Sequence, residues 1–245
     1  MQTIVLATQK GGAGKSTLAI GLARAAIQAG YSVRLIETDA QGTLSSWQGR
    51  RAYAEPLVEP VYAARDVEQR LQSLPDDGTT LAIVDTASGT NAATTAAIRH
   101  ADLCLIPTRP SIADIEAAAA TLSVVRACKK PFAFVFNQTP IRGQRVNNAA
   151  STIGGGAASG MADVVAQPFI AMRNDHQDAL SAGLAVTEFA PASKSADEIR
   201  SLWQWVEAKL NHGVTDHAEA GGDLAGAQSP ARAAAEADAG WDACL

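Results

Sequence analysis

The sequence predicts an α/β fold, in which a mostly parallel, twisted sheet carries helices on both faces. Short apolar runs that read as strands alternate along the chain with segments whose apolar residues recur at helical spacing. Strands separated by helices favour parallel neighbours, because a crossover helix returns the chain to the same end of the sheet. The apolar runs are residues 3–7, 32–36, 80–85, 103–107 and 132–137. Helical spacing is typical of residues 112–128 and 196–210.

A glycine-rich loop follows the first strand, and residues 9–17 read Gln-Lys-Gly-Gly-Ala-Gly-Lys-Ser-Thr. Glycines let backbone N–H groups turn towards an anion, and a helix beginning near Lys15 directs the positive end of its dipole to the same place. In such a loop Lys15 reaches the β- and γ-phosphates of a nucleotide, and the Ser16 hydroxyl binds Mg²⁺. The loop therefore predicts a P-loop NTPase-like fold that binds ATP and Mg²⁺. Its predicted nucleotide-binding residues are Gly11, Gly12, Ala13, Gly14, Lys15, Ser16 and Thr17.

The loop departs from the usual pattern, since Gln9 stands where a glycine is usual and Lys10 adds a second lysine. The run resembles the deviant Walker A motif, K-G-G-x-G-K-[ST], of the ParA/MinD superfamily of ATPases. In that family the first lysine reaches across a dimer interface to the partner's nucleotide. The resemblance implies the same catalytic role for Lys10 beside Lys15, in a homodimer that ATP holds together. The alternative for Lys10 is a solvated loop lysine.

The second strand is followed by Glu37, Thr38, Asp39, Ala40 and Gln41. An acidic residue beside a phosphate loop can orient an attacking water or hold metal-bound water, or it can simply cap the next helix. Family members usually read D-x-D-P-Q here. The resemblance implies that Asp39 positions the hydrolytic water, while the missing proline leaves the stiffness of the loop open.

A third strand ends in Asp85, which is placed to hold Mg²⁺ through water, the Walker B role. Family members commonly continue D-T-P-P, whereas Ala87 stands here in place of the first proline. The predicted metal site therefore consists of Ser16, Asp39 and Asp85. Asn137 closes a later strand where the family's adenine-contacting asparagine lies, although an asparagine is also an ordinary turn former.

The predicted DNA contacts rest on the resemblance alone. Arg173 and Lys194 lie where several relatives place cations that contact phosphates, and solvated surface charges are the alternative. Arg142, Arg145 and Arg200 are further candidates. Residues 143–160, rich in glycine, alanine, asparagine and serine, read as a mobile loop or a weak helix.

Composition divides the chain into an ATPase domain, residues 1–212, and an acidic tail rich in alanine and glycine, residues 213–245, which is predicted to be disordered. The whole chain has 20 Lys and Arg against 25 Asp and Glu, and the tail holds one of the former and six of the latter. The remaining 19 of each sign make the domain neutral, so the overall acidity does not exclude DNA. Cys104, Cys128 and Cys244 form no Cys-x-x-Cys pair and fit reduced thiols in a cytoplasm.

The resemblance is greatest to short ParA-type partition ATPases that lack an N-terminal helix-turn-helix, and it runs from Met1 to about Leu210. It implies an ATPase that binds DNA nonspecifically as an ATP dimer, in the cytoplasm and on the nucleoid, until an adaptor protein on its cargo stimulates hydrolysis. A MinD-like ATPase is one alternative, although the acidic tail does not favour membrane binding. A metabolic P-loop enzyme that acts on small molecules is the other. The cargo, whether plasmid, chromosome region or protein complex, stays open.

Overall fold

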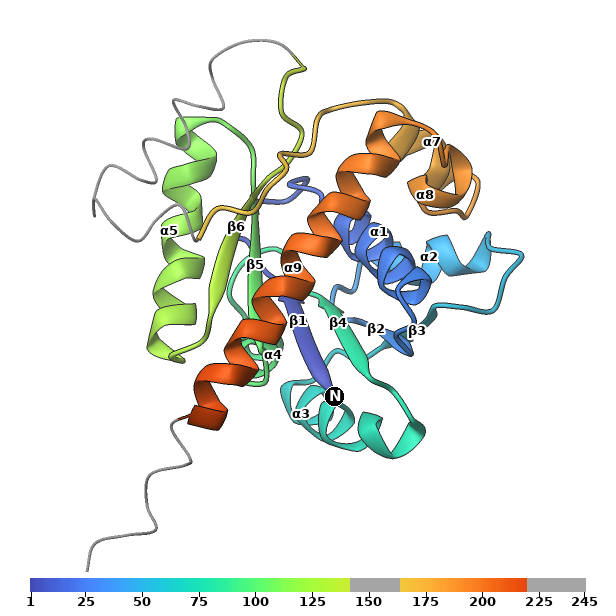
Figure 1. Cartoon of the computed structure of the whole chain (residues 1–245). Coiled ribbons are helices and arrows are strands. Elements are labelled where there is room, and N and C mark those ends of the chain that lie inside the picture. Colours follow the sequence, from blue (N-terminus) through green and yellow to red (C-terminus); the bar gives the residue numbers. More distant parts are fainter. Residues whose placement is uncertain (142–163, 220–245) are drawn as a thin grey trace, which may run out of the picture.

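The computed structural model describes residues 1–141 and 164–219 (Figure 1). Its centre is a six-stranded sheet with the order β3-β2-β4-β1-β5-β6, in which all neighbouring strands are parallel. This arrangement confirms the predicted fold class. The strands are β1 (Gln2–Leu6), β2 (Val33–Glu37), β3 (Leu57–Pro60), β4 (Leu81–Asp85), β5 (Leu103–Thr108) and β6 (Phe132–Phe136).

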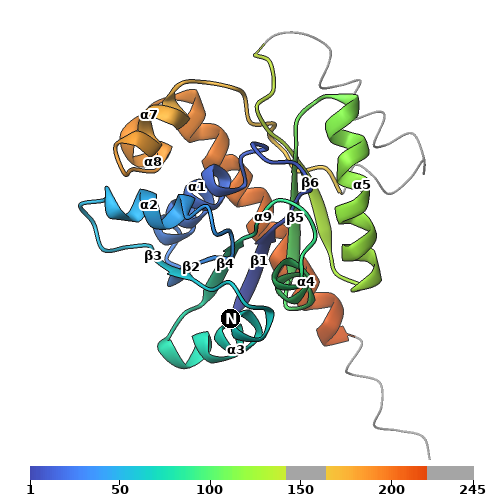
Figure 2. The same ribbon diagram turned by 180° about the vertical axis from the view of Figure 1, so that it is seen from behind.

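Helices cover both faces of the sheet, as two views from opposite sides show (Figures 1 and 2). One core lies between the sheet and α1 (Lys15–Gln28), α2 (Thr43–Gly49), α7 (Asp175–Ser181), α8 (Val186–Phe189) and α9 (Lys194–Glu219). The other core lies under α3 (Ala64–Ser73), α4 (Ala92–Arg99) and α5 (Ile112–Ala127). A short 3₁₀ helix, η1 (Leu74–Asp77), follows α3.

The central strands are largely apolar because both of their faces are buried. In β1, Ile4 and Leu6 belong to the first core, while Val5 belongs to the second. A strand with two buried faces needs apolar residues on both of them, which explains why the strands read as nearly continuous apolar runs.

Strand β3 and the ends of α9 differ from the sequence-based expectation. The sequence gives β3 little signal, because it is four residues long, lies at the edge of the sheet and ends in Pro60. Helix α9 begins at Lys194 and ends at Glu219, so it extends beyond residues 196–210 and across the predicted domain boundary at residue 212. Apolar spacing locates the buried part of a helix and not its ends. Arg142, Arg145 and the segments 143–160 and 220–245 lie outside the described residues.

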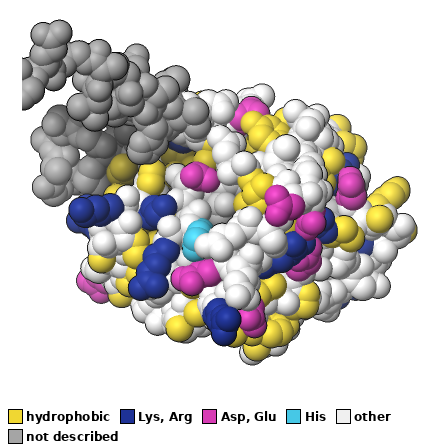
Figure 3. Space-filling model, turned by 90° about the horizontal axis from the view of Figure 1, so that it is seen from below, with side chains coloured by type: hydrophobic (Ala, Val, Ile, Leu, Met, Phe, Trp, Pro, Cys, Tyr) yellow, Lys and Arg dark blue, Asp and Glu magenta, His cyan; other side chains and the backbone are white. Residues whose placement is uncertain are grey.

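Parallel pairing brings the carboxyl ends of the strands to one edge of the sheet. Leu6 of β1 pairs with Asp85 of β4, which in turn pairs with Glu37 of β2. Strands β2, β3 and β4 lie on one side of β1, and the later strands β5 and β6 lie on the other. Open α/β sheets bind ligands at such a reversal of strand order. Figure 3 views the molecule from below, from the end of the sheet where the strands begin, and there basic and acidic side chains are interspersed among apolar ones. Within the described ranges, no helix is long and apolar enough to cross a membrane.

Candidate nucleotide-binding site

The glycine-rich loop joins β1 to α1 as predicted. Gly12 has a φ of +73° and Gly14 a φ of +90°, a left-handed conformation that residues with a Cβ rarely adopt. A Cβ on Gly14 would also overlap the Asn137 amide nitrogen. Lys15 is the first residue of α1, so the free N–H groups and the positive dipole end of a 14-residue helix face the loop. Ser16 and Thr17 follow in the first turn.

Lys15 is buried beneath the loop, where its side chain crosses to the segment that follows β4. Its Nζ donates a hydrogen bond to the Ser88 hydroxyl at 3.2 Å. Burial lowers the pKa of the Lys15 ammonium, and the negative charges of Asp85 and Asp39 oppose that shift. The site therefore holds a partly desolvated cation, which an anionic ligand would stabilise.

Ser16 and Asp85 meet at the end of β4. The Ser16 hydroxyl donates to Asp85 Oδ2 at 2.6 Å. Burial raises the pKa of the Asp85 carboxyl to about 7, although the bond from Ser16 and the charge of Lys15 act in the opposite direction. Among the described residues, nothing hydrogen-bonds to the buried Oδ1 of Asp85. A hydroxyl beside a buried carboxylate with an unused oxygen fits Mg²⁺, which proteins bind through one or two carboxylates and the phosphates of the ligand.

Glu37 and Asp39 have different surroundings although only Thr38 separates them. Glu37 is fully buried and accepts hydrogen bonds from the backbone N–H of Leu44 at 2.6 Å and of Ser45 at 3.2 Å, and from the Ser45 hydroxyl. It therefore caps α2, the alternative role considered for an acidic residue in this loop. Asp39 is half-buried and accepts a bond from the Gln41 N–H at 2.9 Å. Its carboxylate is thus the accessible one of the pair.

Lys10 lies at the mouth of the loop and forms an ion pair within its own chain. Its Nζ is 3.5 Å from Asp114 Oδ2, near the start of α5. The Lys10 side chain is 43% exposed and that of Asp114 is 8% exposed. The Ser111 hydroxyl donates a further hydrogen bond to the Asp114 carboxylate. The ammonium group of Lys10 is therefore paired with a buried carboxylate, while its side chain stays accessible to solvent.

Asn137 lies beside the loop as well. Its amide nitrogen donates to the Ala13 carbonyl at 2.9 Å, and the side chain is buried. The adenine contact stays a prediction. Arg109, Gln138, Ser88 and Asp114 also contact loop residues, and sequence reasoning missed all four. Arg109 lies one residue and Gln138 two residues beyond a strand end, the only signal that could have indicated them.

Two of the candidate DNA-contacting residues that the structure describes already pair with carboxylates. Arg173 forms an ion pair with Glu198 at 2.7 Å and is largely buried, so its charge is already compensated. Lys194 is exposed at the start of α9. Arg200 pairs with Asp197 at 3.0 Å. Phosphate binding by Arg173 therefore requires that it share or leave Glu198, which weakens its candidacy relative to Lys194.

The chain is similar in sequence to several curated proteins, among them the following two. Protein ParA of Rhizobium radiobacter is 32% identical over 130 residues, which are 51% of this chain and 56% of that protein. The match thus spans about half the length of that relative. The maintenance of carboxysome distribution protein A of Halothiobacillus neapolitanus is 26% identical over 208 residues, 82% of this chain and 94% of that protein.

Solved structures share the fold. The apo structure of McdA from Cyanothece has a TM-score of 0.70 and 18% identity, covering 86% of this chain and 99% of that one. MinD of Pyrococcus horikoshii OT3, complexed with Mg-ADP, has a TM-score of 0.66 and 16% identity, covering 86% and 98%. At these identities the likeness shows the fold alone.

The family model described as the CobQ/CobB/MinD/ParA nucleotide binding domain matches residues 4–209. That range begins in β1 and ends in α9, so it includes the glycine-rich loop, Asp39, Asp85 and Asn137. The predicted resemblance to this superfamily is confirmed. The chain belongs to the CobQ/CobB/MinD/ParA family of nucleotide-binding domains.

Proposed function

We propose that this chain is a ParA-type ATPase that dimerises around ATP, binds DNA without sequence preference and partitions or positions a cargo. The observation that carries the proposal is the convergence of Lys15, Ser16 and Asp85 beneath the glycine loop, with the accessible Lys10 at its mouth. Lys15 binds the nucleotide of its own chain, and Lys10 contacts the nucleotide of a second chain.

Each polar group of the site has a defined task in nucleotide binding. The loop N–H groups and Lys15 bind the β- and γ-phosphates, and Lys15 gains a partner for its buried charge. Ser16 and Asp85 hold Mg²⁺, which neutralises phosphate charge when bound. Asp39 accepts a hydrogen bond from the attacking water and so fixes its direction. The accessible position of Asp39 at the end of β2 supports that role.

A dimer places two copies of every surface side by side. Lys10 leaves Asp114 and contacts the nucleotide of the partner subunit, so ATP acts as part of the interface. Doubling the number of phosphate contacts raises DNA affinity and steepens its salt dependence, because each neutralised phosphate releases counterions. Hydrolysis separates the protomers, and an adaptor protein on the cargo stimulates it. The exposed Lys194 supports DNA as the surface that is bound, and the neutral charge of residues 1–212 does not exclude it.

A gel-shift series with random duplex DNA tests the proposal. DNA binding is expected with ATP and not with ADP, on any sequence, and is expected to fade from low to moderate salt. Lys10→Ala should abolish both dimer and DNA binding and leave monomeric ATP binding intact, whereas Lys130→Ala, far from the loop, is the matched control. Binding of the ATP form to anionic liposomes and not to DNA would instead indicate a MinD-like protein. Binding to neither surface, with turnover of a small carboxylate or amine, would indicate a metabolic enzyme.

A further inference from the structure

The Gly12 carbonyl accepts hydrogen bonds from two side chains that lie far from it in the sequence. Arg109 Nη2 donates to it at 2.5 Å and Gln138 Nε2 at 2.8 Å. Arg109 follows the last residue of β5, and Gln138 lies two residues beyond the end of β6. The next carbonyl, that of Ala13, is held in the same way by Asn137. Three side chains from two strand ends therefore fix two consecutive peptide groups of the phosphate loop.

Fixing these carbonyls also fixes the N–H groups of the same peptides. In a planar trans peptide the C=O of one residue and the N–H of the next point in opposite directions. Donors on the carbonyls of Gly12 and Ala13 therefore turn the N–H groups of Ala13 and Gly14 to the opposite side of the loop. A row of N–H groups on one side is the arrangement that binds a phosphate, whereas a carbonyl on that side would repel it.

The backbone of Gln138 indicates that its contact serves more than packing. Its φ is +54°, in the left-handed region that disfavours residues with a Cβ, and only one other non-glycine residue of the described chain, Lys129, shares that conformation. The Asn137 side chain accepts a bond from the Gln138 N–H at 2.9 Å and so supports this turn. Residues strained in this way cluster at ligand-binding and catalytic sites.

Arg109 makes a contact that depends on glycine in the loop. A Cβ on residue 12 would lie 2.9 Å from Arg109 Nη2, so the guanidinium approaches Gly12 as closely as it does only because that residue has no side chain. Within the described residues, the buried Nε of Arg109 has no hydrogen-bond partner. Among the described residues, the Gly12 carbonyl is the one hydrogen-bond acceptor of this guanidinium.

We propose that Arg109 and Gln138 are positioning residues, which hold the Gly12 carbonyl so that the loop N–H groups face the phosphates before a nucleotide arrives. The inference rests on the proposed function, because it assigns a role in the same nucleotide site. Without these two donors the empty loop samples other conformations. The apparent dissociation constant for the nucleotide then equals the intrinsic one divided by the fraction of molecules whose loop is in the binding conformation.

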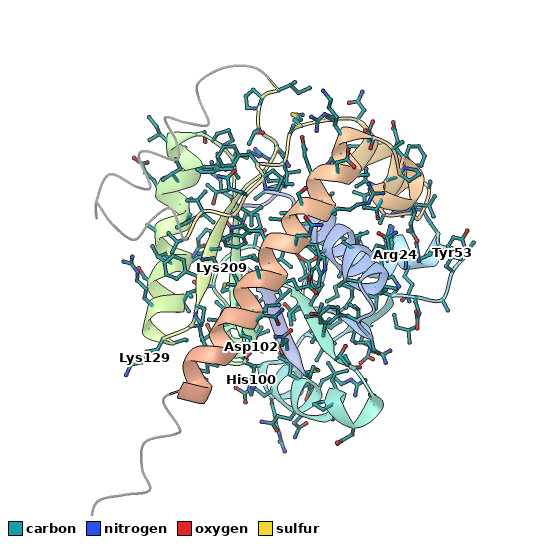
Figure 4. All side chains as sticks on the ribbon, viewed as in Figure 1. Arg24, Tyr53, His100, Asp102, Lys129 and Lys209 are labelled. Atoms are coloured by element: carbon teal, nitrogen blue, oxygen red, sulfur yellow. The ribbon has the colours of Figure 1, made fainter. Side chains whose placement is uncertain are left out.

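Replacement of Gln138 by glycine tests the proposal, with Lys129→Gly as the matched control. Both residues have a φ of +54°, so glycine relieves strain at both positions and both variants should unfold at a denaturant concentration no lower than the wild type. Lys129 lies at the lower end of α5, at the end of the sheet where the strands begin (Figure 4). Gln138→Gly alone should bind Mg-ADP about tenfold more weakly by calorimetry. A loss of affinity without a loss of stability separates positioning from folding.

Arg109→Gln provides the second arm, with Arg126→Gln as its control, because Arg126 lies at the end of α5 distant from the loop and contacts the Phe132 ring. The affinity loss of Arg109→Gln should persist at high salt, where long-range attraction to phosphate is screened. In stopped-flow measurements with a fluorescent ADP analogue, both site variants should bind more slowly and release at the wild-type rate, since positioning acts on the empty loop.

Wild-type affinity in both Gln138→Gly and Arg109→Gln would overturn this inference and leave the proposed function intact. Unchanged association with faster release would overturn it as well, because the contacts would then act only after binding. A wild-type chain that binds no nucleotide would remove the proposed function and the inference together.

Discussion

Lys10 and Asp114 form an ion pair of 3.5 Å between the mouth of the phosphate loop and the first turn of α5. The pair ties Lys10 to its own chain. If Lys10 contacts the nucleotide of a partner subunit, the pair has to open first. Monomer and dimer therefore compete for one lysine, and Asp114 influences how much ATP or protein is needed for dimerisation.

Asp114→Asn should therefore dimerise more readily in ATP. A partly exposed ion pair contributes up to about 1 kcal/mol, so the gain should be about fivefold for each protomer. Asparagine keeps an acceptor for the Ser111 hydroxyl, so the start of α5 is preserved. Sedimentation velocity over a protein concentration series measures the effect. An unchanged dimerisation constant in Asp114→Asn would show that the pair does not restrain Lys10.

Lys15→Ala should lose Mg-ATP binding, by about 100-fold or more, because it removes the main cation that faces the phosphates. The variant should stay folded, since burial lowers the pKa of Lys15 and its removal relieves a desolvated charge in the empty site. Calorimetry with ATP and Mg²⁺ measures affinity, and denaturant unfolding checks the fold. If Lys15→Ala keeps the wild-type affinity for ATP, the assignment of the phosphate loop is wrong.

Asp39→Ala should bind ATP and dimerise but hydrolyse about 100-fold more slowly, because the attacking water loses its hydrogen-bond acceptor. Phosphate release under single-turnover conditions separates hydrolysis from nucleotide exchange. Asp76→Ala, in the 3₁₀ helix η1, offers a control aspartate outside the site. If Asp39→Ala turns over at the wild-type rate, another group orients the water.

Glu37→Ala should lower the stability of the fold, whatever its effect on ATP turnover. It removes a buried carboxylate that accepts three hydrogen bonds at the start of α2, which should lower the free energy of unfolding by about 2 kcal/mol. Denaturant unfolding measures the loss. If Glu37→Ala is as stable as the wild type but no longer hydrolyses ATP, Glu37 takes part directly in the reaction.

The stability of the metal-free protein should depend on the Asp85 carboxyl. Its pKa is about 7 in the fold and 3.8 ordinarily, so between these values the folded state keeps a proton that the unfolded state has lost. Stability attributable to Asp85 should therefore fall as pH rises from about 4 to about 7. Denaturant midpoints of wild type and Asp85→Asn, each without Mg²⁺, measure it. A difference between the two proteins that does not change with pH would contradict the prediction.

The sequence by itself determined the sheet and the phosphate loop, because both depend on residues that are close together in the chain. Apolar runs that need two buried faces located five of the six strands, and the spacing of Gly11, Gly12, Gly14, Lys15 and Ser16 located the loop. The edge strand β3 escaped notice, since a short strand with one neighbour has little need for a continuous apolar run.

Tertiary structure alone decided the partners of the charged and polar groups. Arg109 and Gln138 are 97 and 126 residues away from the Gly12 carbonyl that they hold, and no local pattern relates them to it. Glu37 and Asp39 look equivalent in the sequence, yet one is buried as a helix cap and the other is accessible. Packing also sets the pKa of Asp85 and gives Arg173 a carboxylate partner. Hydrogen bonds and desolvation act over a few ångströms in space, and only the fold determines which residues come that close.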